Sequence, residues 1–116
     1  MGKTTIKNSI NEVLLWTNTS GSTASQTISL DLTPYSEIRF DYYDHGLAMI
    51  HTCYLQKGLN NALIYGCTTQ SWARYITVND TGVTLGQGYK YGGYNGTSST
   101  ADNNVCKPHR IYGVSK

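Results

Sequence analysis

Two stretches of alternating apolar and polar residues, joined by a turn, constrain the fold more than any other feature of this chain. Ile76 and Val78 share one side of an extended segment. After Asn79-Asp80-Thr81-Gly82, Val83 and Leu85 resume the alternation. Asn, Asp and Gly tolerate the backbone conformations that a tight turn needs. The pattern therefore predicts a β-hairpin with one face in a core.

Similar patterns recur along the rest of the chain, and helical spacing does not. Residues 26–32 and 37–43 alternate cleanly, and shorter apolar runs lie at 12–16, 47–55, 62–68 and 105–114. Gly (12) and Tyr (10) are abundant while only 14% of residues are charged, which is typical of strands and turns. We expect an all-β fold, namely a single-domain antiparallel β-sandwich, jelly-roll-like, of about eight strands. Residues 11–116 would form this domain, and residues 1–10 would be a linker or the end of a stalk.

Glycines and tyrosines dominate residues 86–105, which we expect to form a long loop after the hairpin. Tyr89, Tyr91, Tyr94 and Asn95 lie there among glycines. A tyrosine ring stacks on the C–H face of a sugar, and its hydroxyl adds a hydrogen bond at low entropic cost. These residues are the first candidates for ligand binding. Two other interpretations stay open, because the same rings could pack the loop onto the sandwich or form a subunit interface.

Three further residues are weaker candidates for ligand binding. Trp72 has the large ring of a ligand platform, although tryptophan is more often found in a core or an interface. Tyr43 and His45 flank a predicted turn and form, with Tyr42, a second candidate surface.

Catalytic and metal-binding motifs are not expected. Asp41, Asp44, His45 and His51 do not have the spacing of a metal site, so we predict no metal. A glycosidase pair built from Asp41 with Asp44 or Glu37 is possible but has no further support. The glycines of 86–96 precede no helix, so no cofactor is expected.

Charge and hydropathy exclude two classes of partner. The net charge is only +2 and the nine basic residues are scattered, so we expect no nucleic-acid binding. No apolar run approaches the ~20 residues of a membrane helix, and residues 1–7 have no apolar signal core, so we expect neither membrane insertion nor secretion. Cys53, Cys67 and Cys106 lie far apart, and we expect three thiols in a protein made in a reducing cytoplasm.

Three segments carry a resemblance to a known family. They are the opening Leu14-Leu15-Trp16-Thr17-Asn18, the strand Gln26-Thr27-Ile28-Ser29-Leu30-Asp31-Leu32, and the closing Pro108-His109-Arg110-Ile111-Tyr112-Gly113. Together they resemble the carboxy-terminal tip, or knob, domain of tail-fibre and head-fibre adhesin proteins of bacteriophages and prophages. The resemblance spans roughly residues 12–114, and residues 44–72 are the part least like the family.

The resemblance implies a binding role and not an enzyme. Such domains are β-sandwich knobs at the end of a homotrimeric fibre that attaches to the host cell. We therefore expect a homotrimer on the virion, assembled in the bacterial cytoplasm, that binds a host-cell surface glycan or protein. The alternatives are a monomeric carbohydrate-binding module and a structural capsid or tail decoration protein without host binding.

Overall fold

A computed structural model describes residues 11–43, 49–58, 60–66, 70–92 and 98–115, and these form nine β-strands in two antiparallel sheets. Sheet 1 has the order β1-β9-β3-β4, with bounds Asn11–Thr17, Lys107–Ser115, Glu37–Tyr43 and Ile50–Gln56. Sheet 2 has the order β2-β7-β6-β5, with bounds Gln26–Ser29, Gly82–Gly92, Gln70–Asn79 and Asn60–Gly66. The remaining strand, β8 (Ser98–Ala101), pairs with residues 89–92 of β7, whereas β2 pairs with residues 82–85. The predicted all-β sandwich is confirmed, with nine strands in place of about eight.

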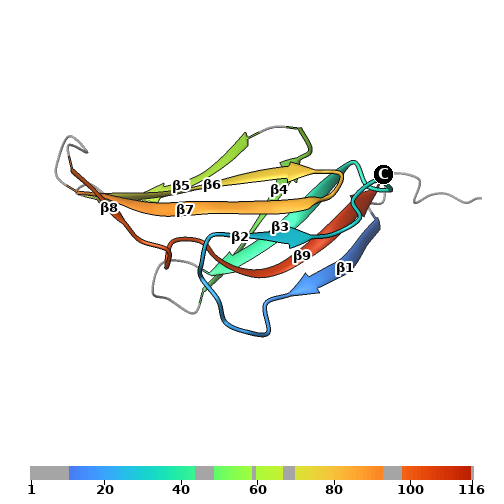
Figure 1. Ribbon diagram of the computed structural model, residues 1–116, viewed down its shortest axis with the longest axis horizontal. Helices are drawn as coiled ribbons and strands as arrows, with labels where there is room; N and C mark the ends of the chain where they lie inside the picture. Colours follow the sequence, from blue (N-terminus) through green and yellow to red (C-terminus); the bar gives the residue numbers. More distant parts are fainter. Residues whose placement is uncertain (1–10, 44–48, 59, 67–69, 93–97, 116) are drawn as a thin grey trace, which may run out of the picture.

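The strand order brings the two ends of the chain together. β1 pairs with β9 and β2 pairs with β7, as the outer strands of a jelly roll do. Between them, β3 and β4 form a hairpin in sheet 1, and β5, β6 and β7 form a meander in sheet 2. Figure 1 shows that β6, β7 and β8 continue well past the ends of the sheet 1 strands. One end of sheet 2 therefore projects from the sandwich.

Alternating residues from both sheets fill the core. Ile38 and Phe40 of β3 are fully buried, and they belong to one apolar cluster with Ile76 of β6. The other buried members of this cluster are Ile28, Leu32, Leu55, Val78, Val83, Leu85, Val105, Cys106 and Ile111. Burying aliphatic and aromatic side chains in this way is the main favourable contribution to folding. The apolar positions predicted from alternation are thus the positions that hold the sheets together.

The turn between β6 and β7 forms as predicted. Asn79 accepts hydrogen bonds at its Oδ1 from the backbone N–H of Thr81 (3.0 Å) and from the Thr81 hydroxyl (2.7 Å). Gly82 has a φ of +147°, and a Cβ there would collide with the backbone carbonyl of Ile28. Glycine is therefore needed at this position both for its backbone conformation and for the close approach of β2.

The prediction of a long loop over residues 86–105 is wrong. β7 runs without interruption from Gly82 to Gly92, and β8 returns along it at 98–101. Glycine weakens a strand, so a glycine-rich segment favours a loop when only the local sequence is considered. Of the described glycines, Gly88 pairs with Arg74 of β6, and Gly92 lies between Gln70 of β6 and Ser98 of β8.

A tyrosine face on the projecting end of sheet 2

A β-bulge in β7 decides which way the tyrosines point. On β6, the inward-facing residue Ile76 pairs with Leu85. The next inward-facing residue, Arg74, pairs with Gly88 and not with Gln87. Two residues of β7, Gly86 and Gln87, therefore lie opposite the single residue Tyr75. An extra residue of this kind reverses the side on which all later side chains lie.

The consequence is that Tyr89 and Tyr91 face outward. In a regular strand they would lie on the same side as Leu85, which is in the core. After the bulge, Gly88 takes the inward position, where a Cβ would collide with the backbone carbonyl of Asp102. Tyr89 then pairs with Ala73 and Tyr91 with Ser71, on the same side of the sheet as Tyr75.

Buried Arg74 holds the bulge in place. Its side chain is 0% exposed, and its Nε donates to the carbonyl of Gly86 at 2.8 Å. Nη1 donates to the carbonyls of Asn103 (2.9 Å) and Val105 (3.1 Å), and Nη2 donates to that of Thr23 (2.7 Å). Burial lowers the pKa of Arg74 to about 10, so the guanidinium stays charged at neutral pH. The residue joins the bulge to the segments before β2 and after β8.

The side chain of Asn103 stabilises the bulge through hydrogen bonds to Gln87 and Gly88. Its Oδ1 accepts from the backbone N–H of Gly88 at 2.8 Å and from Nε2 of Gln87 at 2.6 Å. The backbone N–H of Asp102 donates to the carbonyl of Gly88 at 2.8 Å. The backbone groups left unpaired by the irregular register are satisfied in this way, as buried polar groups require.

Three tyrosines share this outer side, and we call them the tyrosine face: Tyr75, Tyr89 and Tyr91. The rings of Tyr89 and Tyr91 lie 6.2 Å apart between centroids, with an angle of 39° between their planes. Both are half-buried, and Tyr75 is 53% exposed. Figure 1 shows the part of β7 that carries them at the projecting end of sheet 2. A pair of accessible aromatic rings beside each other can stack on a ligand with flat apolar faces.

The other predicted site residues do not join this face. Trp72 pairs with Lys90 and packs against the core, on the opposite side of the sheet from Tyr89. Tyr43 lies on sheet 1, where its ring contacts His109 with 4.9 Å between centroids. Tyr94, Asn95 and His45 lie outside the described residues. Tyr89 and Tyr91 are therefore the predicted residues that the structure brings together.

Around Tyr43, the structure forms a small aromatic and basic group. Lys107 Nζ lies 5.7 Å from the centroid of the Tyr43 ring, within the range of a cation–π contact. Burial lowers the pKa of His109, and the positive charge of Arg110 lowers it further. His51 stacks on Tyr42 of the neighbouring strand at 5.5 Å, so its ring is part of the sandwich packing.

Sequence reasoning missed Tyr75 and a charged network on the outer face of sheet 1. Arg39 donates from Nη1 to Glu12 at 2.8 Å, and from Nε and Nη2 to the two carboxylate oxygens of Asp41 at 3.0 Å each. Its guanidinium also lies 4.4 Å from the centroid of the Tyr112 ring. The alternation of β3 places residues 39 and 41 on one side, and this signal could have found the bidentate pair.

This network also occupies Asp41, the carboxylate common to the glycosidase pair and the metal cluster weighed in the sequence analysis, whereas Asp44 lies outside the described residues. Asp41 is buried and accepts a further hydrogen bond from the hydroxyl of Thr52 at 2.8 Å. The Tyr54 hydroxyl donates to Glu12 at 2.6 Å, and this bond, with Arg39, holds the pKa of Glu12 below its usual value. The same bond raises the pKa of Tyr54. Hydrogen bonds to Glu12 and then to Asp41 raise the pKa of Arg39.

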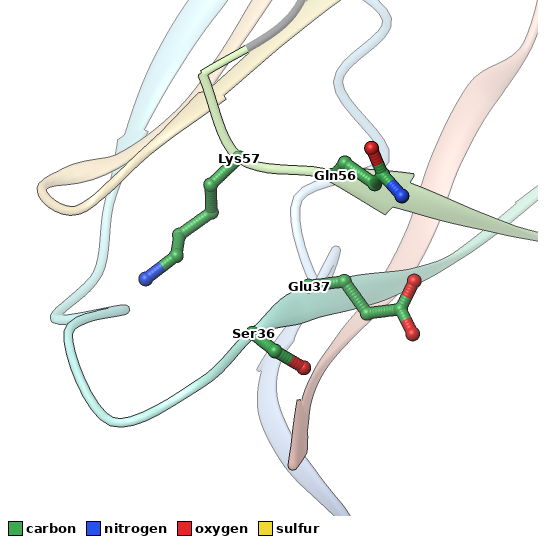
Figure 2. Close-up of a pocket in the computed structure, with 4 residues that line it drawn as sticks. All are labelled: Ser36, Glu37, Gln56 and Lys57. Carbon is green, nitrogen blue, oxygen red and sulfur yellow. The ribbon is translucent and has the colours of Figure 1, made fainter. Parts of the chain in front are cut away.

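A shallow polar pocket of about 210 Å³ lies between the start of β3 and the end of β4. It is lined by Ser36, Glu37, Gln56 and Lys57, and Figure 2 shows Lys57 pointing away from Glu37 and Gln56. The ammonium of Lys57 donates to the carbonyl of Leu32 at 3.1 Å and to Asp80 at 2.8 Å. Lys57 therefore connects the end of β4 to the loop before β3 and to the β6–β7 turn.

Within the described ranges, no three His, Cys, Asp or Glu side chains gather in a way that could hold a metal ion. The same ranges contain no helix long and apolar enough to cross a membrane. Comparisons with family models, curated proteins and solved structures find no match for this chain.

Proposed function

We propose that this chain is a binding domain at the tip of a phage or prophage fibre, and that it attaches to a glycan or protein on the host-cell surface. The tyrosine face is the observation that carries the proposal. Tyr89 and Tyr91 are turned away from the core by a bulge that buried Arg74 holds. Accessible tyrosines on a rigid scaffold are a common basis of recognition.

Homotrimer formation on the virion is part of the same proposal and rests on the resemblance of the strand motifs. The edge strand β1 is the part of sheet 1 best suited to an assembly contact, because its adjacent residues Val13 and Leu14 are both about half exposed. Sheet 1 would face other copies while the tyrosine face stays accessible. Three weak sites on one axis then raise avidity without any new contact.

Adhesion of the labelled chain to intact bacteria tests the proposal. Purified protein is incubated with a panel of Gram-positive and gut species, and bound fluorescence is compared between the natural chain and Y89A/Y91A. We expect binding to at least one species and its loss in the double variant, with a trimer mass by light scattering. If no species binds the natural chain, or the double variant binds equally well, the tyrosine face is not the receptor site.

A second candidate is a monomeric carbohydrate-binding module, favoured by the position of the tyrosines on a sheet face and not in a loop. A solution mass of one chain, together with binding to free glycans, would favour this candidate over the fibre tip. Both candidates are binding proteins, and neither requires catalysis.

A further inference from the structure

The strands of sheet 2 are nearly free of charge. Their sequences contain only two charged residues, Arg74 and Lys90. Arg74 is fully buried, and Lys90 pairs with Trp72 on the side away from the tyrosine face. The strands of sheet 1 contain six: Glu12, Glu37, Arg39, Asp41, Lys107 and Arg110. The charges of the sandwich are thus segregated onto the other sheet.

Small uncharged residues surround the tyrosine face. Ser99 and Ala101 of β8 pair with Tyr91 and Tyr89 and are exposed, so the face is open on that side. Further along the sheet, Thr27 and Thr84 are exposed, and their hydroxyls lie 3.4 Å apart. A charged ligand would find no partner among the described side chains of this face, whereas hydroxyl groups match its Ser, Thr and Tyr hydroxyls.

The angle between the two rings restricts the shape of the ligand. Tyr89 and Tyr91 are inclined at 39°, so one flat surface cannot lie against both rings at once. Two consecutive sugar rings of a twisted or curved chain can, because each ring has its own apolar C–H face and its own tilt. A crystalline glycan with coplanar rings does not fit this arrangement.

We propose that the tyrosine face binds a neutral glycan chain through two consecutive sugar rings that are inclined to one another. This inference rests on the proposed function and names the class of its ligand. Stacking on Tyr89 and Tyr91 supplies the affinity, and the lack of nearby charge selects against acidic glycans.

Calorimetry on the full chain tests the inference with defined probes. The neutral probes are hexasaccharides of α-1,4-glucose, β-1,3-glucose and α-1,6-mannose, the acidic probe is a galacturonate hexamer, and the flat probe is microcrystalline cellulose. We expect at least one neutral hexasaccharide to bind, with an affinity that salt does not change, and neither the acidic nor the flat probe to bind. Binding only to the galacturonate hexamer, only to cellulose, or to no probe would overturn the inference.

Single variants locate the binding. We expect Y89A and Y91A each to weaken it roughly three- to tenfold, since one stacking contact is lost, while Y89F keeps most of the affinity. Tyr54, on the other sheet, provides the control Y54A, which should bind as the natural chain does. If Y89A and Y91A change the solution mass and leave glycan affinity unchanged, the face is an interface between copies.

These results separate the inference from the proposed function. If the chain adheres to bacteria through Tyr89 and Tyr91 but binds only the galacturonate hexamer, the face is the receptor site and its ligand class is wrong. If neutral glycans bind while adhesion to bacteria is absent, the ligand class holds and the fibre-tip role fails.

Discussion

Replacing Arg74 with methionine gives the most direct test of how the projecting end of sheet 2 is held. The methionine side chain keeps most of the apolar stem but removes all four hydrogen bonds from the guanidinium to backbone carbonyls. We expect the R74M variant to lose much of the stability of the fold and to loosen the bulge at Gly86.

The magnitude follows from what happens to the four carbonyls. Val105 is buried, and leaving its carbonyl without a donor costs about 1–3 kcal/mol. Thr23, Gly86 and Asn103 are half-buried, so water can replace part of the lost bonding, and each should cost about 0.5–1 kcal/mol. Relief from burying a charge offsets some of this sum. The net loss should be about 3 kcal/mol, a large part of the ~5–15 kcal/mol by which a small domain is stable.

Urea denaturation followed by tryptophan fluorescence measures this loss. With a slope of about 1.5 kcal/mol/M, the midpoint should fall by about 2 M. The matched control is R110M, because Arg110 is exposed and its loss should cost less than about 0.5 kcal/mol. A loss below about 1 kcal/mol for R74M would refute the reasoning, since it would mean that the four carbonyls do not depend on the guanidinium.

Four other predictions follow from contacts of single residues. G88A should destabilise the fold by about 2 kcal/mol or more, measured by thermal unfolding, because a Cβ there meets the carbonyl of Asp102. The lowered pKa of Glu12 contributes stability above its unfolded value of 4.5, and this contribution is lost as the pH falls through the folded pKa. The melting temperatures of the natural chain and of E12Q should therefore converge in acid. Y54F removes a hydrogen bond to Glu12, and NMR titration should then show a higher Glu12 pKa. Burial raises the pKa of Cys53 to about 11, so iodoacetamide at pH 8 should label it only after unfolding, as read by mass spectrometry; rapid labelling of the folded chain would contradict this.

The strands that could be predicted from sequence are those with a regular period of two. β3 has the predicted bounds 37–43, because Ile38 and Phe40 fill the core while Arg39 faces out. β2 ends at Ser29 and not at 32, yet the backbone N–H groups of Leu30 and Leu32 still donate to the β6–β7 turn. Alternation finds the buried side of a strand, and the neighbouring backbone decides where the ladder ends.

The candidate site could be predicted only in its residue types. Tyr89 and Tyr91 were selected for their chemistry, but glycines at 86, 88 and 92 favoured a loop over a strand. β8 has only four residues and no apolar alternation, so its sequence does not predict a strand. It nevertheless pairs with β7 at both tyrosines, Ala101 opposite Tyr89 and Ser99 opposite Tyr91. Pairing between distant segments satisfies the backbone of a glycine-rich strand, and a local pattern does not contain that information.

The bulge also fixes the sides of the sheet on which Gly88 and the two tyrosines of β7 lie. Once Gly86 and Gln87 together oppose Tyr75, inward positions fall on residues 88 and 90 and outward positions on residues 89 and 91. The inward position of Gly88 is closed by the carbonyl of Asp102, whereas the outward positions carry the two half-buried tyrosine rings. Deleting Gln87 would remove the extra residue and leave Gly88 inward and both tyrosines outward, whereas a regular pairing that kept Gln87 would turn both tyrosines toward the core. With Gln87 in the sequence, the outward position of the tyrosines therefore requires the bulge, which Arg74 and Asn103 hold through hydrogen bonds to Gly86 and Gly88.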